Sequence, residues 1–279
     1  MAEKWNLVID IDECINCQNC TLAVQDEYAE CAHPGYAAPM PKHGHRWIDI
    51  KRTERGRHPI IDVSFIPVMC NHCDDASCFA AAENGAIEKR VDGIVLIHPD
   101  KAKGQRQLVD ACPFGAIWWN EDEQVPQHWN FDAHLLDCGW KEPRCVNVCP
   151  TGALESLKIS DVQMAKKAEA ENLEVLLPEL SVKPRVYYKN LFRYSKAFVA
   201  GSVTRAVDDR EECAAGVSVV LSHAGETVAT TGTDDFGDFL FDGLDKFSGD
   251  YLLQIQQDGQ PPLNKKVKIE NSVVVEISI

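Results

Sequence analysis

The chain has 279 residues, of which 45% are hydrophobic and 25% charged, as in an ordinary globular protein with a sizeable core. This length suggests about two domains. The formal net charge of −15 argues against a nucleic-acid partner, because phosphate binding relies on clustered Lys and Arg. No stretch is long and apolar enough to span a membrane, and the N-terminus lacks the apolar core of a signal peptide. We therefore expect a cytoplasmic protein.

The first part of the chain, 1–158, is dominated by cysteine. Eleven of the 12 cysteines precede residue 150, and only Cys213 lies beyond. In a reducing compartment, C-x2-C spacing indicates metal binding or redox chemistry rather than disulfides. Residues 112–117 (CPFGAI) and 149–154 (CPTGAL) both carry the Cys-Pro tail with which bacterial iron–sulfur motifs end.

This first part has the pattern of a fourfold repeat of short strand, cysteine loop and short helix, which is typical of ferredoxins. An apolar strand at 7–10 leads into the first cysteine motif, and the polar insertion at 30–69 is expected to form loops with one strand at 47–50. A third strand is expected at 93–97, after the second motif. The third repeat ends at Cys112 and the fourth runs from about 128 to 150.

Residues 159–198 are predicted to connect two domains. Ser160 and Gln163 have the spacing of a capping box, which predicts a helix to about Asn172. Prolines break the segment that follows. Residues 185–194 are aromatic and basic, and we expect them to pack on the first domain, with a partner interface as the alternative.

Residues 199–279 change to a period-two pattern. Short alternating apolar runs, divided by Gly, Asp and Asn turns, predict a small antiparallel β-sandwich. Residues 233–239 (TDDFGDF) resemble the T-x-x-x-G-x-F signature of transthyretin-like or carboxypeptidase-regulatory-like domains. The predicted fold class is thus α+β, with two paired 4Fe–4S ferredoxin repeats followed by this β-sandwich. The β-sandwich is expected to have a binding or structural role.

Counting ligands decides how many clusters the first domain can hold. In paired-cluster ferredoxins each [4Fe–4S] cluster takes three cysteines from one motif and the tail cysteine of its partner. Pairing the first motif with the fourth, and the second with the third, completes two sites. The first cluster site is Cys14, Cys17, Cys20 and Cys149, and the second is Cys70, Cys73, Cys78 and Cys112.

The partner sites have lost their ligands. One would need Ala82, Ala102, Gln105 and Leu108, and the other would need Val24. None of these side chains is a thiolate, so the sequence predicts two [4Fe–4S] clusters and two abandoned sites. Structural zinc is the competing metal, but the triple Cys spacing and the Cys-Pro tails favour iron–sulfur.

Four cysteines remain outside these sets. Cys145 stands where the third cysteine of the fourth motif belongs and is interpreted as a remnant of a lost site. Cys31, Cys138 and Cys213 are expected to be small buried apolar residues. A third, unusual cluster held by Asp132, Cys138 and Cys145, with His128 as a further ligand, stays open as an alternative.

The chain resembles the ferredoxin-like electron-transfer subunits of the dimethyl-sulfoxide-reductase family of molybdenum and tungsten enzymes. It is most similar to the branch formed by the small subunits of pyrogallol–phloroglucinol transhydroxylase and resorcinol hydroxylase, including the β-domain. The stretches that carry this resemblance are 33–36 (HPGY), 44–47 (GHRW), 92–97 (DGIVLI), 133–136 (AHLL) and 183–190 (KPRVYYKN).

The resemblance implies a large partner subunit, in a heterodimer or a multiple of it, that carries Mo or W on bis-molybdopterin guanine dinucleotide and performs the chemistry. It also implies three clusters, because the transhydroxylase branch likewise lacks the cluster of the third motif. Here, however, residues 129–132 (WNFD) replace the C-x2-C of the fourth motif, so the residues support two clusters. The resemblance implies that these are the two ends of a line of clusters.

Three functional hypotheses follow. The leading one is a non-catalytic iron–sulfur electron-transfer subunit of an enzyme acting on phenols. The second is a scaffolding subunit whose clusters stabilise the fold without changing redox state, as bound metals can. The third is a self-contained ferredoxin with a binding domain. The third is the least favoured, because a soluble carrier has no need of the aromatic segment and the β-domain.

Overall fold

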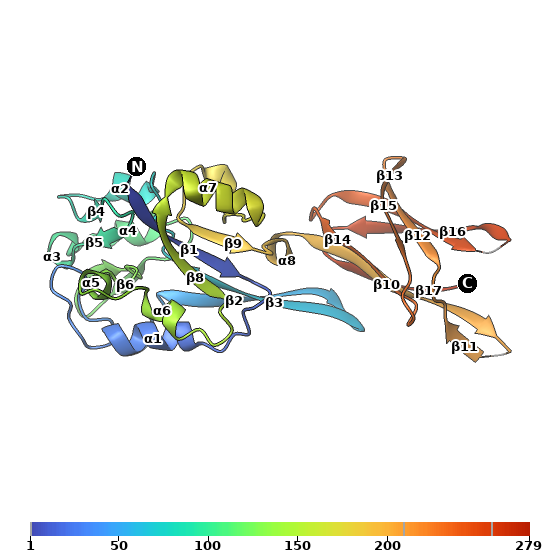
Figure 1. The fold of residues 1–279 in the computed structure, drawn as a ribbon, viewed down its shortest axis with the longest axis horizontal. Coiled ribbons are helices and arrows are strands. Elements are labelled where there is room, and N and C mark those ends of the chain that lie inside the picture. Colours follow the sequence, from blue (N-terminus) through green and yellow to red (C-terminus); the bar gives the residue numbers. More distant parts are fainter. Residues whose placement is uncertain (1, 209, 258) are drawn as a thin grey trace. The chain divides into compact units, whose positions relative to one another are not determined.

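The structure, a computed structural model, describes residues 2–208, 210–257 and 259–279 (Figure 1). The chain forms two compact units. Unit 1 comprises Met1–Arg52 and Phe65–Leu191, and unit 2 comprises Thr53–Ser64 and Phe192–Ile279. In the described part of the chain, no helix is both long and apolar enough to cross a membrane.

A three-stranded sheet forms one layer of unit 1. Strand β1 (Glu3–Asp10) lies in the centre, antiparallel to β8 (Leu154–Ser160) and parallel to β9 (Val186–Lys189). Leu7 and Ile9 of β1 are fully buried. Helix α7 (Asp161–Ala170) packs on β1 and β8. It begins with the predicted capping box, in which the Ser160 side chain accepts the Gln163 backbone N–H.

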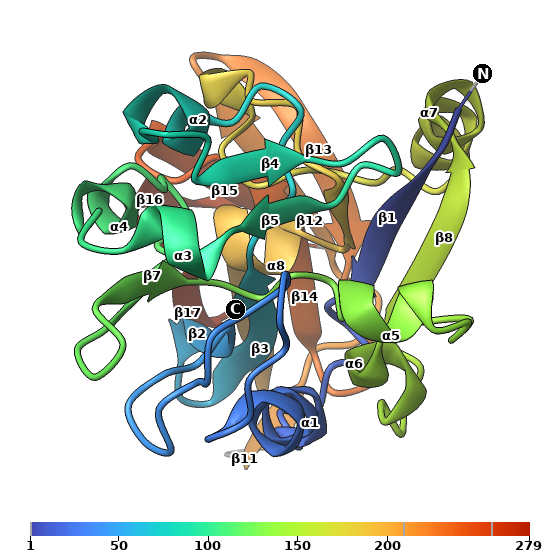
Figure 2. The ribbon, with the colours of Figure 1, turned by 90° about the vertical axis from the view of Figure 1, so that its left-hand side faces the viewer.

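The cysteine motifs lie in and beside short helices of unit 1 that pack in pairs (Figure 2). Helix α1 (Asn19–Tyr28) lies against α6 (Arg144–Asn147), and α2 (Ser77–Ala81) lies against α4 (Gln107–Asp110). These are the first motif with the fourth and the second with the third, the pairing that the ligand count predicts. The other short elements are β4 (Ile87–Lys89), β5 (Val95–Ile97), α3 (Pro99–Ala102), β6 (Trp118–Asn120), β7 (Val125–Gln127), α5 (Ala133–Asp137) and the 3-10 helix η1 (Pro178–Leu180).

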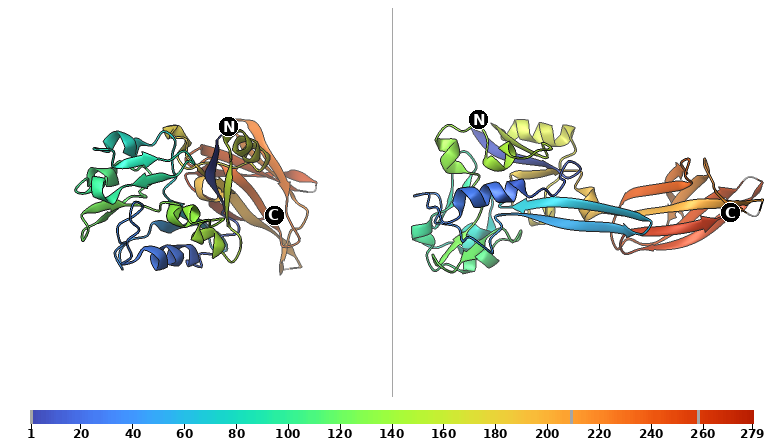
Figure 3. Two further views of the ribbon diagram at one scale, coloured as in Figure 1. Left: turned by 60° about the vertical axis from the view of Figure 1, so that its left-hand side comes forward. Right: turned by 90° about the horizontal axis from the view of Figure 1, so that it is seen from below.

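The prediction of loops with one strand over 30–69 is wrong. The segment contains a hairpin of two ten-residue strands, β2 (Ile48–Arg57) and β3 (Ile60–Met69), visible as one long ribbon in Figure 3. Polar residues fill most of β2, so its strand pattern is hidden in the sequence. The hairpin tip, 53–64, belongs to unit 2, and its base belongs to unit 1.

Unit 2 contains two four-stranded sheets around one apolar core. In the first sheet, β10 (Ala197–Val207) pairs with β11 (Arg210–Cys213), β14 (Asp238–Leu244) and β17 (Val273–Ser278). The order of the second sheet is β13 (Glu226–Gly232), β12 (Ser218–His223), β15 (Gly249–Gln257) and β16 (Gln260–Ile269). The pairing of β10 with β17 is parallel, which corrects the prediction of a wholly antiparallel domain.

The expected connecting segment, 159–198, is not a separate linker. Helix α7 and strand β9 belong to unit 1, and only the end of the segment, with α8 (Phe192–Ser195), belongs to unit 2. Val186 and Tyr188 of β9 are fully buried beside β1. The aromatic segment therefore packs on the first domain, as expected, up to Leu191.

Candidate metal centres

The first predicted ligand set lies together in unit 1. Cys14, Cys17, Cys20 and Cys149 line one cavity, together with apolar residues that include Ile50 and Pro67. Asn16 and Gln18 have positive φ values of 58° and 63°, which let the short loop turn back on itself before α1. Cys17 is exposed, whereas Cys20 is buried at the start of α1.

The thiols of this first set are close enough to affect one another. The pKa of Cys20 is raised to about 11, mainly by burial and in part by Cys14 and Cys17 as nearby like charges. Burial also raises the pKa of Cys14, with Cys149 and Cys17 as neighbouring charges. Such crowded thiolates are unfavourable together unless cations bind among them, and thiolates are the ligands that iron–sulfur clusters use. The donor set therefore fits an iron–sulfur cluster.

The second predicted set, Cys70, Cys73, Cys78 and Cys112, is also brought together. Burial raises the pKa of Cys73 to about 12 and that of Cys78 to about 11, and Cys112 adds to both shifts as a neighbouring charge. Burial raises the pKa of Cys112 as well. Against this, backbone N–H groups of Ala116, Phe114 and Gly115 hydrogen-bond to Cys112 and favour its thiolate. The Cys-Pro-x-Gly-Ala turn therefore supplies donors to a ligand sulfur.

A half-buried lysine, which no pattern in the sequence singles out, lies close to the second set. Lys89 Nζ donates to the carbonyl oxygens of His72 (2.6 Å), Cys73 (3.2 Å) and Gly93 (2.8 Å). It also forms an ion pair of 2.8 Å with Asp74. Burial would raise the pKa of Asp74, but hydrogen bonds from Arg185 and Lys89 lower it to about 2. The loop between Cys70 and Cys73 is thus fixed by a charged network.

The abandoned site of the third motif is filled by packed side chains. Ala102 and Leu108 are fully buried in the apolar core between β4, β5 and the short helices. Gln105 is buried and hydrogen-bonds the backbone of Glu83 and Lys101. These positions therefore serve as core and as local hydrogen-bonding residues.

The alternative third cluster fits the structure poorly. The buried Asp132 carboxylate already accepts the Tyr28 hydroxyl at 2.9 Å and the Arg144 backbone N–H at 2.8 Å. Cys145 is buried beside Asp132, but Cys138 is exposed. The His128 and His72 ring centroids lie 5.9 Å apart. Val24 is buried and apolar, as the abandoned-site interpretation requires.

Three expectations about single cysteines are wrong. Cys31, Cys138 and Cys213 are exposed, not buried. A lone cysteine gives no periodic signal from which burial could be predicted.

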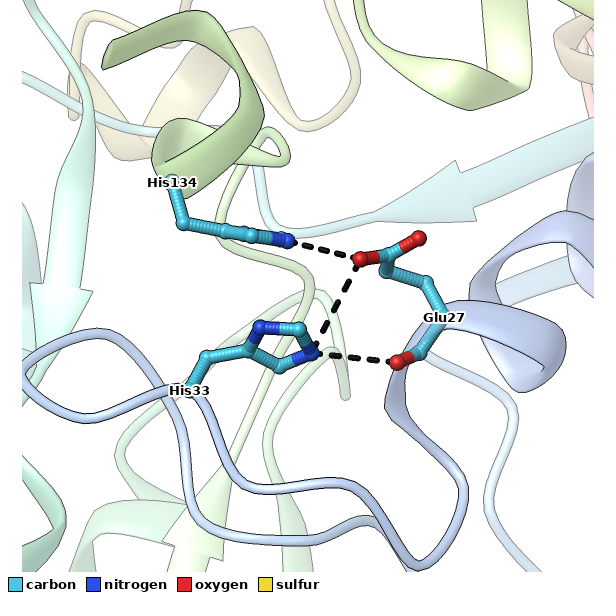
Figure 4. A group of neighbouring side chains, drawn as sticks. All are labelled: Glu27, His33 and His134. Carbon is cyan, nitrogen blue, oxygen red and sulfur yellow. Dashed lines mark hydrogen bonds and ion pairs between the residues drawn. The ribbon is translucent and has the colours of Figure 1, made fainter. Parts of the chain in front are cut away.

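A further cluster of metal-binding side chains has no counterpart among the sequence predictions (Figure 4). Glu27 at the end of α1, His33 in the following loop and His134 on α5 bring their donor atoms within 4.8 Å of one another. His134 is more than a hundred residues from the other two, so no spacing pattern links them. The two stretches that contain these histidines stand out in the sequence only through the family resemblance.

Two sets of four cysteines, in and beside paired short helices, indicate the class of the protein: an iron–sulfur protein. Known proteins agree. The 4Fe-4S dicluster domain family matches residues 61–158. The pyrogallol hydroxytransferase small subunit of Pelobacter acidigallici is 46% identical over 92% of this chain and 92% of its own length. The chain therefore belongs to the family of that small subunit, which confirms the resemblance in the sequence.

More distant relatives are iron–sulfur and electron-transfer subunits of reductases. The arsenate respiratory reductase iron–sulfur subunit of Shewanella is 25% identical over 70% of this chain and all of its own length. The thiosulfate reductase electron transfer subunit of Salmonella typhi is 27% identical over 60% of this chain and 82% of its own. Among solved structures, 5-hydroxyisourate hydrolase of Klebsiella pneumoniae matches 30% of this chain and 89% of its own length, with 19% sequence identity. The TM-score of 0.26 is too low to define a fold.

Proposed function

We propose that this chain is the electron-transfer subunit of a molybdenum or tungsten bis-pterin enzyme that hydroxylates or transhydroxylates phenolic compounds. The catalytic cofactor would lie on a large partner subunit. The observation that carries this proposal is the presence of two complete four-cysteine sets in a chain that is 46% identical to a pyrogallol hydroxytransferase small subunit. Thiolate ligands persist in a reducing compartment, so the proposal places the protein in the cytoplasm.

The ligands are assigned by set. Cys14, Cys17, Cys20 and Cys149 would hold one [4Fe–4S] cluster, and Cys70, Cys73, Cys78 and Cys112 would hold the other. When bound, such a cluster supplies one-electron transfer. The residues around it set its potential through charge, hydrogen bonds and exposure to water. For the second site these residues are Lys89, which brings a positive charge, and the 114–116 backbone, which donates to the Cys112 sulfur.

The finer architecture is part of the same proposal. The pairs α1 with α6 and α2 with α4 correspond to two ferredoxin repeats, and the two sheets of unit 2 correspond to a transthyretin-like β-sandwich. The ferredoxin part would then lie within unit 1, and the β-domain would correspond to unit 2. Removing either sheet of unit 2 would expose its apolar core, so we expect the β-domain to act as a folded whole.

Two cluster sites that protein side chains occupy would interrupt a line of clusters and so leave a gap in the path of electrons. In the proposed arrangement, three positions that would carry cluster ligands have other roles. Ala102 and Leu108 are packed core residues, and Asp132 is hydrogen-bonded. A transhydroxylase, whose overall reaction consumes no electrons, tolerates such a gap better than a respiratory enzyme. This favours a transhydroxylase-type reaction within the family.

Electron paramagnetic resonance of the native complex tests the function. Substrate is added anaerobically to the purified complex, and the cluster signals are followed during turnover. Signals that appear and decay at the rate of turnover support electron transfer. Clusters that stay in one redox state during turnover, yet can be reduced by dithionite, would replace this proposal with the scaffolding role. A stable monomer with ferredoxin activity in native extracts would contradict the subunit assignment altogether.

A further inference from the structure

The strongest feature outside the cysteine sets is the group of Glu27, His33 and His134 in unit 1 (Figure 4). Both imidazole Nε2 atoms point to the same carboxylate oxygen, Glu27 Oε1, at 2.8 Å from His134 and 3.8 Å from His33. His33 Nε2 also lies 3.0 Å from the Glu27 main-chain oxygen. The three side-chain donors thus lie within 4.8 Å of one another, and they come from a helix end, a loop and a second helix.

These distances suit a single transition-metal ion. In a tetrahedral site with bonds of about 2.0–2.1 Å, neighbouring ligand atoms lie roughly 3.3 Å apart. The two separations from Glu27 Oε1 lie on either side of that value, so small side-chain rotations are enough to admit an ion. Two imidazoles and one carboxylate form a set that zinc uses in sites with an open fourth position. The three side chains are 12–17% exposed, which leaves access for an ion and for one water.

The surroundings prepare the carboxylate for this role. Burial raises the pKa of Glu27, but hydrogen bonds from His134 and Arg144 outweigh it and lower the pKa. Arg144 binds the other oxygen, Glu27 Oε2, at 2.5 Å, and so leaves Oε1 to the two histidines. Arg144 is itself neutralised by Asp26 at 2.6 Å.

The second nitrogen of one histidine also has a partner. His134 Nδ1 lies 3.4 Å from the Tyr28 hydroxyl, and that hydroxyl lies 2.9 Å from the buried Asp132 carboxylate. A histidine that binds a metal normally uses its other nitrogen in such a contact, which fixes the ring and its tautomer. The His33 and His134 rings pack with centroids 4.0 Å apart, so they support each other in place.

We propose that Glu27, His33 and His134 bind one zinc-class divalent cation, with water in the fourth position. The ion would join the loop after α1 to α5, next to the segment 129–132 in which this chain has no cysteine ligands. The nitrogen ligands exclude Mg²⁺ and Ca²⁺ as preferred ions. This site uses none of the cysteines, so it stands or falls independently of the proposed clusters.

The test uses the full protein with its iron–sulfur clusters in place. Zinc content is measured after equilibrium dialysis against buffered Zn²⁺, with iron and sulfide determined on the same sample. We expect one zinc per chain at unchanged iron, and at least tenfold weaker binding in His33→Gln and in His134→Gln. The matched control is His98→Gln, because His98 makes the same 2.8 Å pair with Glu88 but lacks a second imidazole. It should bind zinc as the unaltered protein does.

X-ray absorption at the zinc edge identifies the zinc ligands in the unaltered protein, so this test does not depend on whether the variants fold. The proposal predicts a shell of nitrogen and oxygen atoms with two imidazoles and no sulfur. A sulfur shell would place the zinc at cysteines and overturn the proposal. The absence of bound zinc would also overturn the proposal. So would zinc binding that is unchanged in His33→Gln and His134→Gln, or that is weakened equally in His98→Gln.

Discussion

Cys112 shows how a single residue can report on the assignment of the clusters. It ends the third motif, but its own upstream positions are core residues, and its sulfur groups with Cys73 and Cys78. We predict that Cys112→Ala removes the cluster of the second set and leaves that of the first, so that iron content falls by half. Cys138→Ala, which changes an exposed cysteine outside both sets, is the control and should keep all of the iron.

The chemical analysis would also show if this assignment is wrong. Full iron content in the Cys112→Ala protein, or loss of both electron paramagnetic resonance signals together, would contradict separate four-cysteine sites.

Lys89 is the residue that we expect to tune the second cluster. Its ammonium contacts the carbonyl of Cys73, and a nearby positive charge favours the reduced, more negative cluster. Lys89→Met should lower the reduction potential of this cluster by on the order of 50–100 mV. This shift corresponds to the Coulomb interaction of two unit charges about 10 Å apart at an effective dielectric constant near 20. Lys89→Arg should retain most of the potential. Redox titration followed by electron paramagnetic resonance measures both.

The first cluster is an internal reference in that titration, because its site lies at a different set of cysteines. Equal shifts of both clusters, or no shift of either, would show that Lys89 does not act on the second site through its charge.

At the residue scale, the sequence could predict which cysteines lie together but not which residues support them. The Cys spacings and tails are local patterns, so they are readable. Lys89 and Glu27 are ordinary charged residues in sequence, and their roles arise only because the fold brings distant carbonyls and histidines to them.

Among the elements, strand β10 depends on a glycine. A Cβ at Gly201 would lie 2.2 Å from the main-chain oxygen of its partner Val275 and 3.0 Å from the Phe239 ring. Gly201→Ala should therefore destabilise unit 2 by about 3 kcal/mol, because backbone of the parallel pair must move. Gly232 in β13 is the matched control, since a Cβ there meets only Val217 O at 4.0 Å. Gly232→Ala should change stability by about 0.5–1 kcal/mol in the favourable direction.

Hydrogen exchange of β10 and β12 amides in the full chain distinguishes these cases. Faster exchange in Gly201→Ala alone supports the close approach. Similar exchange rates in the two variants would contradict it.

The elements that the sequence predicted are those with a local signal. The capping box at Ser160 and the alternating runs of unit 2 specify their structure within a few residues. The hairpin of β2 and β3 was missed because β2 is mostly polar, and the parallel partner of β10 could not be predicted because β17 lies some 70 residues away in sequence.

At the scale of the whole molecule, the sequence already indicated a cysteine-rich part followed by a β-rich part. It could not show that residues 53–64 join unit 2 or that β9 joins the first sheet, because both depend on pairing between distant strands. The lost ligands were informative in the same way as the retained ones. Positions without sulfur predicted abandoned sites. In the structure Ala102 and Leu108 are packed core, and Gln105 hydrogen-bonds the local backbone.

The central claim is that the molecule holds two [4Fe–4S] clusters. The most direct test is quantitative analysis of iron and acid-labile sulfide in the native complex, corrected for any cluster on the partner subunit. Two clusters correspond to about eight iron and eight sulfide per chain. Values near eight for both would support the account, and values near twelve would contradict it by showing that a third site is filled.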